Sequence, residues 1–414
     1  MLLNRAHVYA LRPTVEQAAR LAAWAGATRC AYNLALEQRL KWHRKNWLER
    51  RFNFASQCRE LTQLRAEFDW MRDVPISALQ QALRDLEKAF TNWWSGRAGA
   101  PSPRKRGLND AMRFTESFAF RRLSKHVGEV KLPKLGWVRM RWDKALPGGA
   151  VVKSVTVRHE VGQWVVSAAY EMEQAEPAPS ALPLVGIDRG VDVFAALSDG
   201  VFCDGPNVGR QAAKSLARAQ RALVRKQRGS NNRLKARRKV ERLHARIRRA
   251  RLDFLHKAST AVAKSHGTVV LEKLQVKNMT ASARGTLDEP GRRVRQKAGL
   301  NRSILDQGWG MFATFLRYKL AQRGGELVEV NPAYSSQTCA ECGHVAAASR
   351  RGSTFCCVSC GHEAHADTNA ARVILQRGIA VLNARGMDKA PLSLEARRAV
   401  ERGTVPNHSA PRAA

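Results

Sequence analysis

Two pairs of cysteines near the carboxyl end of the chain constrain its fold more than any other feature. Cys339 and Cys342 form the first pair, Cys357 and Cys360 form the second, and two residues separate the cysteines of each pair. This spacing lets four thiolates meet one Zn²⁺ tetrahedrally, with each pair on a tight turn. A glycine follows the second cysteine of both pairs, which suits such a turn. The sequence therefore predicts one structural zinc site.

The ligand set leaves some alternatives open. Cys356 could replace Cys357, although only Cys357 preserves the two-residue gap to Cys360. A reduced thiol cluster without metal is the alternative to zinc. Three histidines lie nearby as further candidate ligands: His344, His362 and His365.

The charge of the chain is strongly unbalanced. Its 71 Lys and Arg residues against 35 Asp and Glu residues give a formal net charge of +36. So much positive charge resists compaction unless a polyanion neutralises it, and counterion release makes nucleic acid the expected partner. A hydrophobic content of 44% over 414 residues is enough to bury a sizeable core in two or three domains.

The sequence favours a reduced, cytoplasmic protein. Residues 1–14 lack a continuous apolar core before a small-residue cleavage site, so we expect no signal peptide. No apolar run approaches the roughly 18 residues that a membrane-spanning helix needs. Half of the eight cysteines lie in the two pairs, which favours a metal site over the disulfides of a secreted protein.

The first half of the chain changes from helical to strand patterning. Residues 15–95 have helical spacing of apolar residues, and one helix is predicted from Ile76 to Trp94. Short alternating stretches at 127–142 and 151–170 predict strands of a small barrel or sheet. Residues 173–183, rich in Pro, Ala and Glu, have a linker composition, and we expect a domain boundary there.

The second half alternates strands with helices, which indicates an α/β plan. Strands are predicted at 184–188, 193–197, near 202, at 268–271 and at 326–330; helices are predicted in the basic segment before 268, at 302–323 and at 367–376.

Two acidic residues of this half end predicted strands. Asp188 and Glu272 each follow a run of apolar residues, so their side chains should project where ligands bind in open α/β sheets. Asp367 is predicted at the start of a helix, from which it can lean over the same edge. Taken singly, each acid could instead be a solvated turn or cap residue.

Together, these three carboxylates would repel one another unless hard cations such as Mg²⁺ shared them. Two such ions roughly 4 Å apart can activate a water and stabilise the leaving 3′ oxygen of a phosphodiester. A nuclease centre in which Asp188, Glu272 and Asp367 are both the catalytic residues and the magnesium ligands is therefore one interpretation, and three separate turn or cap residues are the other. The spacing alone does not decide between them.

A basic segment lies between the first two acids. From Arg210 to Arg251 there are seventeen Lys or Arg residues and one acid, Glu241. An apolar stripe interrupted by a turn at 229–232 predicts a helical hairpin. Phosphate contact explains the uncompensated charge better than a solvated face does. Most of the ten Trp residues are expected in the core, although any of them could stack on bases.

These residues together resemble the TnpB family, transposon-encoded RNA-guided nucleases regarded as ancestral to type V CRISPR effectors. The resemblance covers about residues 1–382. In the second half it is carried by Gly186-Ile187-Asp188-Arg189-Gly190, Leu197-Ser198-Asp199-Gly200, Leu271-Glu272-Lys273-Leu274, Lys277-Asn278-Met279, Tyr334-Ser335-Ser336-Gln337-Thr338-Cys339, Cys360-Gly361-His362 and Asp367-Thr368-Asn369-Ala370-Ala371. In the first half it is carried by Gly26-Ala27-Thr28-Arg29, Tyr32-Asn33, the 78–90 segment and Lys131-Leu132-Pro133-Lys134-Leu135-Gly136-Trp137.

The resemblance implies a multidomain α+β fold. Its parts would be a RuvC-like, RNase H-type nuclease domain bearing the triad, a zinc ribbon, a helical recognition lobe and a wedge β-barrel. The implied boundaries are 1–14 for the first barrel strand, 15–108 for the recognition lobe, 109–175 for the rest of the barrel, 183–337 and 365–382 for the nuclease domain, 338–364 for the ribbon and 383–414 for a disordered tail.

The resemblance also implies partners. Such proteins bind a guide RNA derived from the transposon end, pair it with target DNA and read a short flanking motif with protein side chains. The expected product is a double-strand break that maintains the element at its donor site, made on DNA of the bacterial nucleoid. The sequence leaves the oligomeric state open, with a monomer favoured.

One departure from the family and three alternatives remain. Many relatives carry Asp-Arg-Asp where this chain has His365-Ala366-Asp367, and losing the neighbouring charges is expected to affect metal affinity. A nuclease-inactive RNA-guided repressor is one alternative, but such proteins lose triad acids and this chain keeps all three. A compact type V CRISPR effector and a DNA-strand transferase using the same metal fold are the others.

Overall fold

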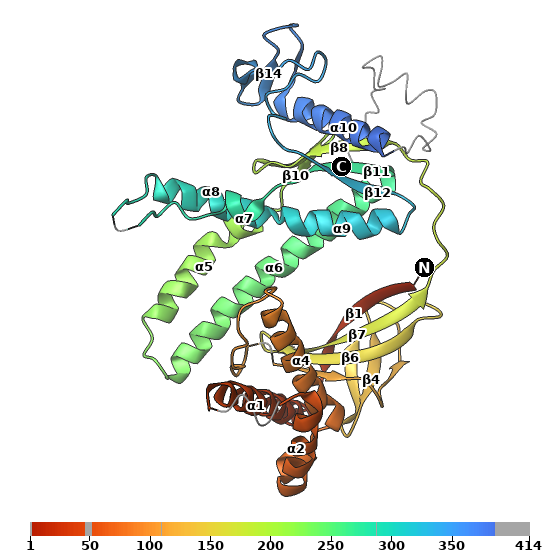
Figure 1. Ribbon diagram of the computed structural model, residues 1–414, viewed down its shortest axis with the longest axis vertical. Coiled ribbons are helices and arrows are strands. Elements are labelled where there is room, and N and C mark those ends of the chain that lie inside the picture. Colours follow the sequence, from red (N-terminus) through yellow and green to blue (C-terminus); the bar gives the residue numbers. More distant parts are fainter. Residues whose placement is uncertain (1, 46–51, 109, 287, 386–414) are drawn as a thin grey trace. The chain divides into compact units, whose positions relative to one another are not determined.

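The computed structural model describes residues 2–45, 52–108, 110–286 and 288–385 in two compact units, Met1–Ala175 and Glu176–Ala414 (Figure 1). The division falls within the linker predicted at 173–183. Most of the tail predicted at 383–414 lies outside the described residues. None of the helices in these ranges combines the length and apolarity needed to cross a bilayer.

The first unit contains an antiparallel sheet of seven strands in the order β2-β6-β7-β1-β5-β4-β3. Its strands are β1 (Leu2–Arg12), β2 (Ala111–Phe114), β3 (Ala119–Arg122), β4 (Val127–Leu132), β5 (Gly136–Arg141), β6 (Val151–Glu160) and β7 (Gln163–Glu173). β1 pairs with β7 along most of its length and with β5 only at Leu11 and Arg12, so it joins two halves of the sheet. Among the described residues no ladder joins β2 to β3, so hydrogen bonds do not close the predicted barrel.

Between β1 and β2 the described residues form four helices. They are α1 (Val15–Lys45), α2 (Phe54–Glu67), α3 (Asp69–Arg72) and α4 (Ile76–Trp94). α4 begins directly after Pro75 and buries Leu79, Leu83, Leu86 and Phe90, whose three- and four-residue spacing forms one apolar face. The helix predicted at 76–94 is confirmed.

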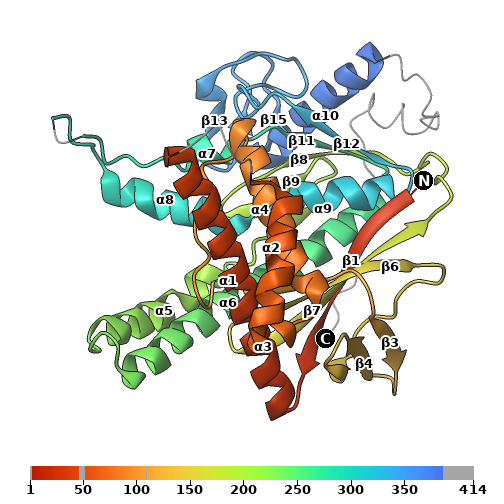
Figure 2. The same cartoon turned by 60° about the horizontal axis from the view of Figure 1, so that its bottom comes forward.

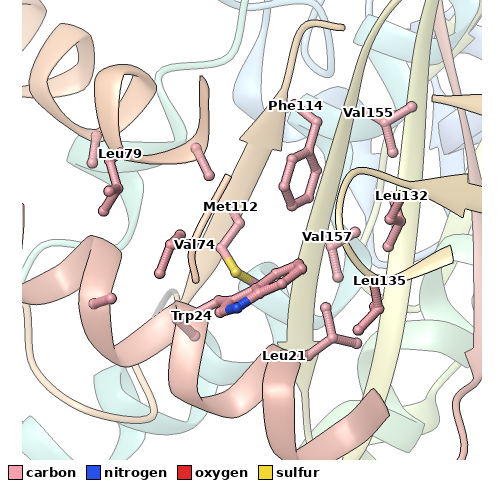
Figure 3. Packing of buried hydrophobic residues seen from close by; sticks show 14 of the residues in the cluster. Leu21, Trp24, Val74, Leu79, Met112, Phe114, Leu132, Leu135, Val155 and Val157 are labelled. Atoms are coloured by element: carbon pink, nitrogen blue, oxygen red, sulfur yellow. The ribbon is translucent and has the colours of Figure 1, made fainter. Parts of the chain in front are cut away.

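The helices share one core with the sheet. Trp24 of α1 lies between the helices and the sheet beside Met112 of β2, with Val74 and Leu79 on the helical side (Figure 3). All four side chains are at most 1% exposed. The prediction of a helical block followed by strands is therefore correct, and both belong to one folded unit.

The second unit is built on a mixed sheet of five strands in the order β10-β9-β8-β11-β12. These strands are β8 (Leu184–Asp188), β9 (Val193–Leu197), β10 (Phe202–Asp204), β11 (Thr268–Glu272) and β12 (Glu326–Val330). β8, β11 and β12 are parallel, whereas β9 pairs antiparallel with β8 and β10. All five strands lie where the sequence predicted them.

Helices cover both faces of this sheet (Figure 1). In the described part of this unit the helices are α5 (Val208–Val224), α6 (Asn231–Ser265), α7 (Val276–Met279), α8 (Val294–Gln307), α9 (Trp309–Ala321) and α10 (Ala366–Ala384), and three of them, α6, α9 and α10, pack on the sheet. α9 and the last turns of α6 pack on one face, around Phe312 and Leu316. α10 packs on the other face, where Ile374 contacts β11 and β12.

One predicted helix is wrong. Residues 302–323 form two helices, because Gly308 adopts the left-handed conformation, with φ of 72°, and separates α8 from α9. Glycine adopts this conformation without the penalty that a Cβ would bring. The helix predicted at 367–376 also continues further, to Ala384.

α5 and α6 form the predicted helical hairpin and lie side by side in both views (Figure 2). Its turn contains Gly229, with φ of 82°, and Ser230 caps α6 by accepting a hydrogen bond from the Arg233 N–H. The remaining elements belong to the cysteine segment: η1 (Ala347–Ser349), β13 (Arg350–Arg351), β14 (Thr354–Cys356) and β15 (Glu363–His365), of which the three strands form a small sheet.

Candidate active site

The face on which Asp188 lies follows from strand alternation. On β8, Val185 and Ile187 belong to the core shared with α6 and α9. Gly186 faces α10, because a Cβ at that position would lie 2.1 Å from the Ala371 carbonyl oxygen. Side chains two residues apart on a strand point the same way. Asp188 at the end of β8 therefore points to the α10 side of the sheet.

Glu272 lies on the same side. Val269 and Leu271 of β11 belong to the α9 core, whereas Val270 packs against α10 near Gly378. Glu272 follows Val270 by two residues and is 6% exposed. Since β8 and β11 are parallel neighbours, both acids end adjacent strands at the same edge of the sheet.

Asp367 comes to this edge from the helix. It occupies the first turn of α10, and its backbone N–H donates to the His365 Nδ1 that caps the helix. A carboxylate in the first turn is favoured by the helix dipole. Its Oδ1 also accepts a hydrogen bond from the Arg350 guanidinium at 2.9 Å.

The three acids act on one another electrostatically. Burial, and then the charges of Glu272 and Asp367, raise the pKa of Asp188 from its usual 3.8 to about 7. The Arg350 charge and the backbone N–H of Arg189 only partly oppose this shift. Asp188 has no side-chain hydrogen-bond donor among the described residues. An excess of carboxylate charge with few donors suits a divalent cation.

The three carboxylates lie at the same edge of the sheet, but their oxygen atoms do not converge on one point. Among the described residues, only the cysteine cluster brings three or more metal-ligating side chains to within 4.8 Å of one another. Glu272 is held by the Ser335 hydroxyl, which donates to its Oε1, and Asp367 is held by Arg350. Each of these two acids therefore has its own hydrogen-bond donor.

The sequence analysis missed three residues that contact this site. They are Arg189, Ser335 and Arg350. Ser335 lies in one of the motifs that carry the family resemblance, but no sequence pattern predicts its hydrogen bond to Glu272. Arg350 lies between the cysteine pairs, and its spacing to Asp367 carries no periodic signal. Such contacts arise only when segments far apart in the chain pack together.

The four paired cysteines form the predicted cluster. The Sγ atoms of Cys339 and Cys360 are 3.7 Å apart, and those of Cys342 and Cys357 are 3.6 Å apart. Sulfurs about 2.3 Å from a tetrahedral Zn²⁺ would lie roughly 3.8 Å from one another, so the donor set fits that ion. Cys356 lies outside the cluster and points its thiol toward Glu363, which resolves the choice in favour of Cys357.

Both cysteine pairs use the same turn. The N–H groups of Gly343 and Gly361 donate to the carbonyls of the first cysteine of their pairs, and both glycines have φ near 74°. The three neighbouring histidines are absent from the cluster that the described residues form.

Side-chain amides join the cysteine segment to α10. Buried Asn369 donates to the Thr338 carbonyl at 2.7 Å and accepts from the Ala340 N–H at 3.0 Å. Gln376, two turns later, donates to the Ala340 carbonyl at 2.6 Å. The first cysteine pair is thereby fixed to the helix that carries Asp367.

The α5–α6 hairpin presents a row of unpaired cations. Val240, Leu243 and Ile247 of α6 point inward, and an exposed stripe runs along the opposite side of the helix. The stripe consists of Lys235, Arg238, Lys239, Arg242, Arg246 and Arg249. Within the described residues none of these six side chains forms an ion pair. By contrast, Arg237 pairs with Glu241. The stripe is complementary to a polyanion.

Three segments match known families. Residues 167–283 match the IS605 OrfB family, described as "Probable transposase". Residues 309–374 match a "Cas12f1-like, TNB domain", and residues 1–46 match a "Helix-turn-helix domain". Over the last of these segments the structure has strand β1 and a single long helix, α1.

Whole-chain relatives are bacterial proteins. InsQ of Escherichia coli K12, named as an RNA-guided DNA endonuclease, is 42% identical over 381 residues, covering 91% of this chain and 93% of that protein. A protein of Streptomyces pristinaespiralis, named for the same activity, is 36% identical over 386 residues, covering 91% and 90%. Among solved structures, a Cas12f1–sgRNA–target DNA complex gives a TM-score of 0.48 at 13% identity, covering 90% of this chain and 98% of that one.

Proposed function

Because the chain belongs to the TnpB family of IS605 OrfB proteins, we propose that it is an RNA-guided DNA endonuclease encoded by a transposon. Its guide would be an RNA from the transposon end, and its substrate would be double-stranded DNA beside a short flanking motif. Its cleavage would maintain the element at its donor site.

One observation carries the catalytic part of the proposal. Asp188, Glu272 and Asp367 come from two parallel strand ends and a helix start on one side of a sheet, and burial together with the charges of Glu272 and Asp367 raises the pKa of Asp188 to about 7. Carboxylates brought to one sheet edge in this way support a metal-dependent phosphodiesterase. A solvated turn or cap residue would show no such coupling.

The sheet supports a RuvC-like, RNase H-type domain. Its central strand β8 bears the first acid, an antiparallel β9–β10 pair extends one edge, and parallel β11 and β12 extend the other. We assign residues 183–337 and 365–382 to this domain, and 338–364 to a zinc ribbon. In the first unit we assign 15–108 to a recognition lobe, with 1–14 and 109–175 as a wedge domain around it.

We assign Mg²⁺ to the three carboxylates and Zn²⁺ to the four cysteines. When bound, Mg²⁺ would activate the attacking water and stabilise the leaving 3′ oxygen. Asp188, which has no side-chain donor among the described residues, is the acid most available to a cation. Arg350, whose guanidinium donates to Asp367, would supply a positive charge beside this site for a phosphate oxygen of the substrate.

The exposed cation stripe on α6 supports contact with nucleic-acid phosphates. No Phe, Trp or Tyr occurs from position 208 to 253, so the basic part of this hairpin lacks the large aromatic side chains on which unpaired bases usually stack. It is suited to holding a backbone without reading its sequence. Sequence recognition would then rest on guide pairing and on other residues.

Plasmid cleavage by the full chain with its copurified RNA tests the proposal. The RNA is sequenced, its guide is re-targeted, and plasmids with a randomised flank are incubated with Mg²⁺. We expect double-strand breaks from the wild type and none from Asp188→Ala, with target binding retained. The matched control is Asp253→Ala, which removes an exposed helical aspartate.

Two outcomes would favour other functions. Guide-dependent binding of the wild type without any cleavage in Mg²⁺ would support an RNA-guided repressor. Purified active protein that contains no RNA and joins DNA strands would support a transferase.

A further inference from the structure

Arg189 is a buried cation beside the proposed active site. It directly follows Asp188 and is only 7% exposed. Since consecutive strand residues point to opposite faces, its side chain leaves the sheet on the α9 side. We propose that Arg189 is a positioning residue that ties the strand ends bearing Asp188 and Glu272 to the start of α9, a role that rests on the proposed nuclease function.

The contacts of the guanidinium join three elements. One terminal nitrogen, Nη2, donates to the backbone carbonyl of Glu272 at the end of β11, and Nη1 lies 3.5 Å from the Trp309 carbonyl in the first turn of α9. The backbone of Arg189 itself continues from β8. One planar group thus connects both acid-bearing strands to a helix. Arg189 binds the main-chain carbonyl of Glu272, whereas Ser335 donates a hydrogen bond to the carboxylate of the same residue.

Packing alone does not explain an arginine at this position. Within the described residues the guanidinium has no salt-bridge partner, and its buried Nε has no hydrogen-bond partner. Burial lowers its pKa, whereas the charges of Glu272, Glu329 and Asp188 favour its charged form. An apolar residue would avoid the cost of an unpaired buried charge. The charges of these three acids offset part of that cost.

A fork-shaped donor is required by the two acceptors. Glu272 and Trp309 present their carbonyls to different nitrogens of one rigid group, which a guanidinium can satisfy at once. Lysine would keep the positive charge but offer a single compact ammonium. Arg189→Lys therefore separates the contribution of the charge from that of the bridging geometry, and Arg189→Met removes both.

The test measures metal binding and cleavage separately. In the full chain, Mn²⁺ titration followed by electron paramagnetic resonance gives the site-specific affinity, defined as the part lost in Asp188→Ala. Single-turnover plasmid cleavage gives the Mg²⁺ concentration for half-maximal rate. The control is Arg385→Met, which removes a half-exposed arginine paired with Glu326 at the far edge of the sheet. Tm and target affinity are recorded for every variant.

For Arg189→Met we expect a 10- to 100-fold weaker Mn²⁺ affinity and a matching rise in the required Mg²⁺, on the order of the effects of outer-shell partners. Arg189→Lys should recover part of the loss, and both should bind target DNA normally. An Arg189→Met variant with the Mn²⁺ affinity of the wild type would overturn the inference. So would an Arg189→Lys variant whose loss of Mn²⁺ affinity is no greater than that of Arg385→Met. A wild-type protein that binds Mn²⁺ through Asp188 but does not cleave DNA would refute the nuclease proposal and leave the positioning role of Arg189 in metal binding intact.

If Arg189→Met fails to fold, the Arg189→Lys comparison decides the question, because it keeps the buried charge. Weaker metal binding at an unchanged Tm supports positioning through the fork. A parallel fall in Tm, target affinity and metal affinity would make Arg189 a general structural residue and refute the proposal.

Discussion

Replacing Asp188 by Asn should stabilise the magnesium-free protein at alkaline pH, even though it removes a proposed catalytic residue. The pKa of Asp188 is raised to about 7 from its usual 3.8. At a pH between these two pKa values, Asp188 keeps its proton in the folded state, whereas it has lost that proton in the unfolded state. Stability therefore falls as the pH rises through this window, and the loss is complete above about pH 7.

The magnitude follows from the size of the shift. About three pKa units at 1.36 kcal/mol each correspond to roughly 4 kcal/mol above pH 7. At pH 5 only about a third of that penalty has developed. Asparagine has a similar shape and no charge, so the advantage of Asp188→Asn over the wild type should grow by about 2–3 kcal/mol from pH 5 to pH 8. For a unit of this size that is roughly 5–10 °C in Tm.

Thermal unfolding of the full chain, with zinc retained and no added magnesium, measures this difference across the pH range. The exposed Asp253, replaced by Asn, is the control and should show no such trend. Adding Mg²⁺ should raise the Tm of the wild type at pH 8 and have little effect on Asp188→Asn. A difference that stays flat with pH, or an Asn variant less stable than the wild type at pH 8, would refute the electrostatic account of the site.

Three further predictions follow from the contacts. We expect elemental analysis to find one zinc per chain in the wild type and in Cys356→Ser, and none in Cys357→Ser; equal zinc in both variants would contradict the assigned ligand set. Ser335→Ala removes the hydroxyl that holds Glu272 and should weaken Mn²⁺ affinity several-fold with little change in Tm, and unchanged affinity would argue against that contact. Gly186→Ala forces a Cβ against the α10 backbone and should destabilise the second unit by several kcal/mol in urea unfolding; a loss below about 1 kcal/mol would mean that the helix can shift.

Local patterns predicted the parts of the site that local chemistry determines. The spacing of the cysteine pairs predicted both turns and favoured Cys357, which preserves the two-residue gap, but left Cys356 as an alternative that the structure removes. The apolar runs before Asp188 and Glu272 predicted strands that end at these acids. Parallel pairing then brings both strand ends to one edge, a consequence of topology that the alternation of strands and helices already indicates.

The face of the sheet could not be predicted from these runs, because β8 and β11 are buried on both sides. Gly186 decides it in the structure: the absence of a side chain lets α10 approach β8, and Asp188 follows on that side. Sequence patterns identify the glycine but not the helix that lies against it. The break at Gly308 was missed for a similar reason, since apolar spacing continues through 302–323 while the left-handed backbone ends one helix and begins the next.

The contacts of Arg350 and Asn369 join the cysteine segment, which lies between β12 and α10 in the sequence, to α10. Asn369 fixes the first cysteine pair to α10, and Arg350, from the loop between the pairs, reaches Asp367 in the first turn of the same helix. When bound to the four cysteines, the proposed zinc would close this segment, so its binding energy would restrain the position of Arg350 as well as the cysteines. The segment therefore bears on the proposed active site through a carboxylate seven residues beyond its last ligand, and zinc loss should disturb Asp367 before it disturbs the sheet.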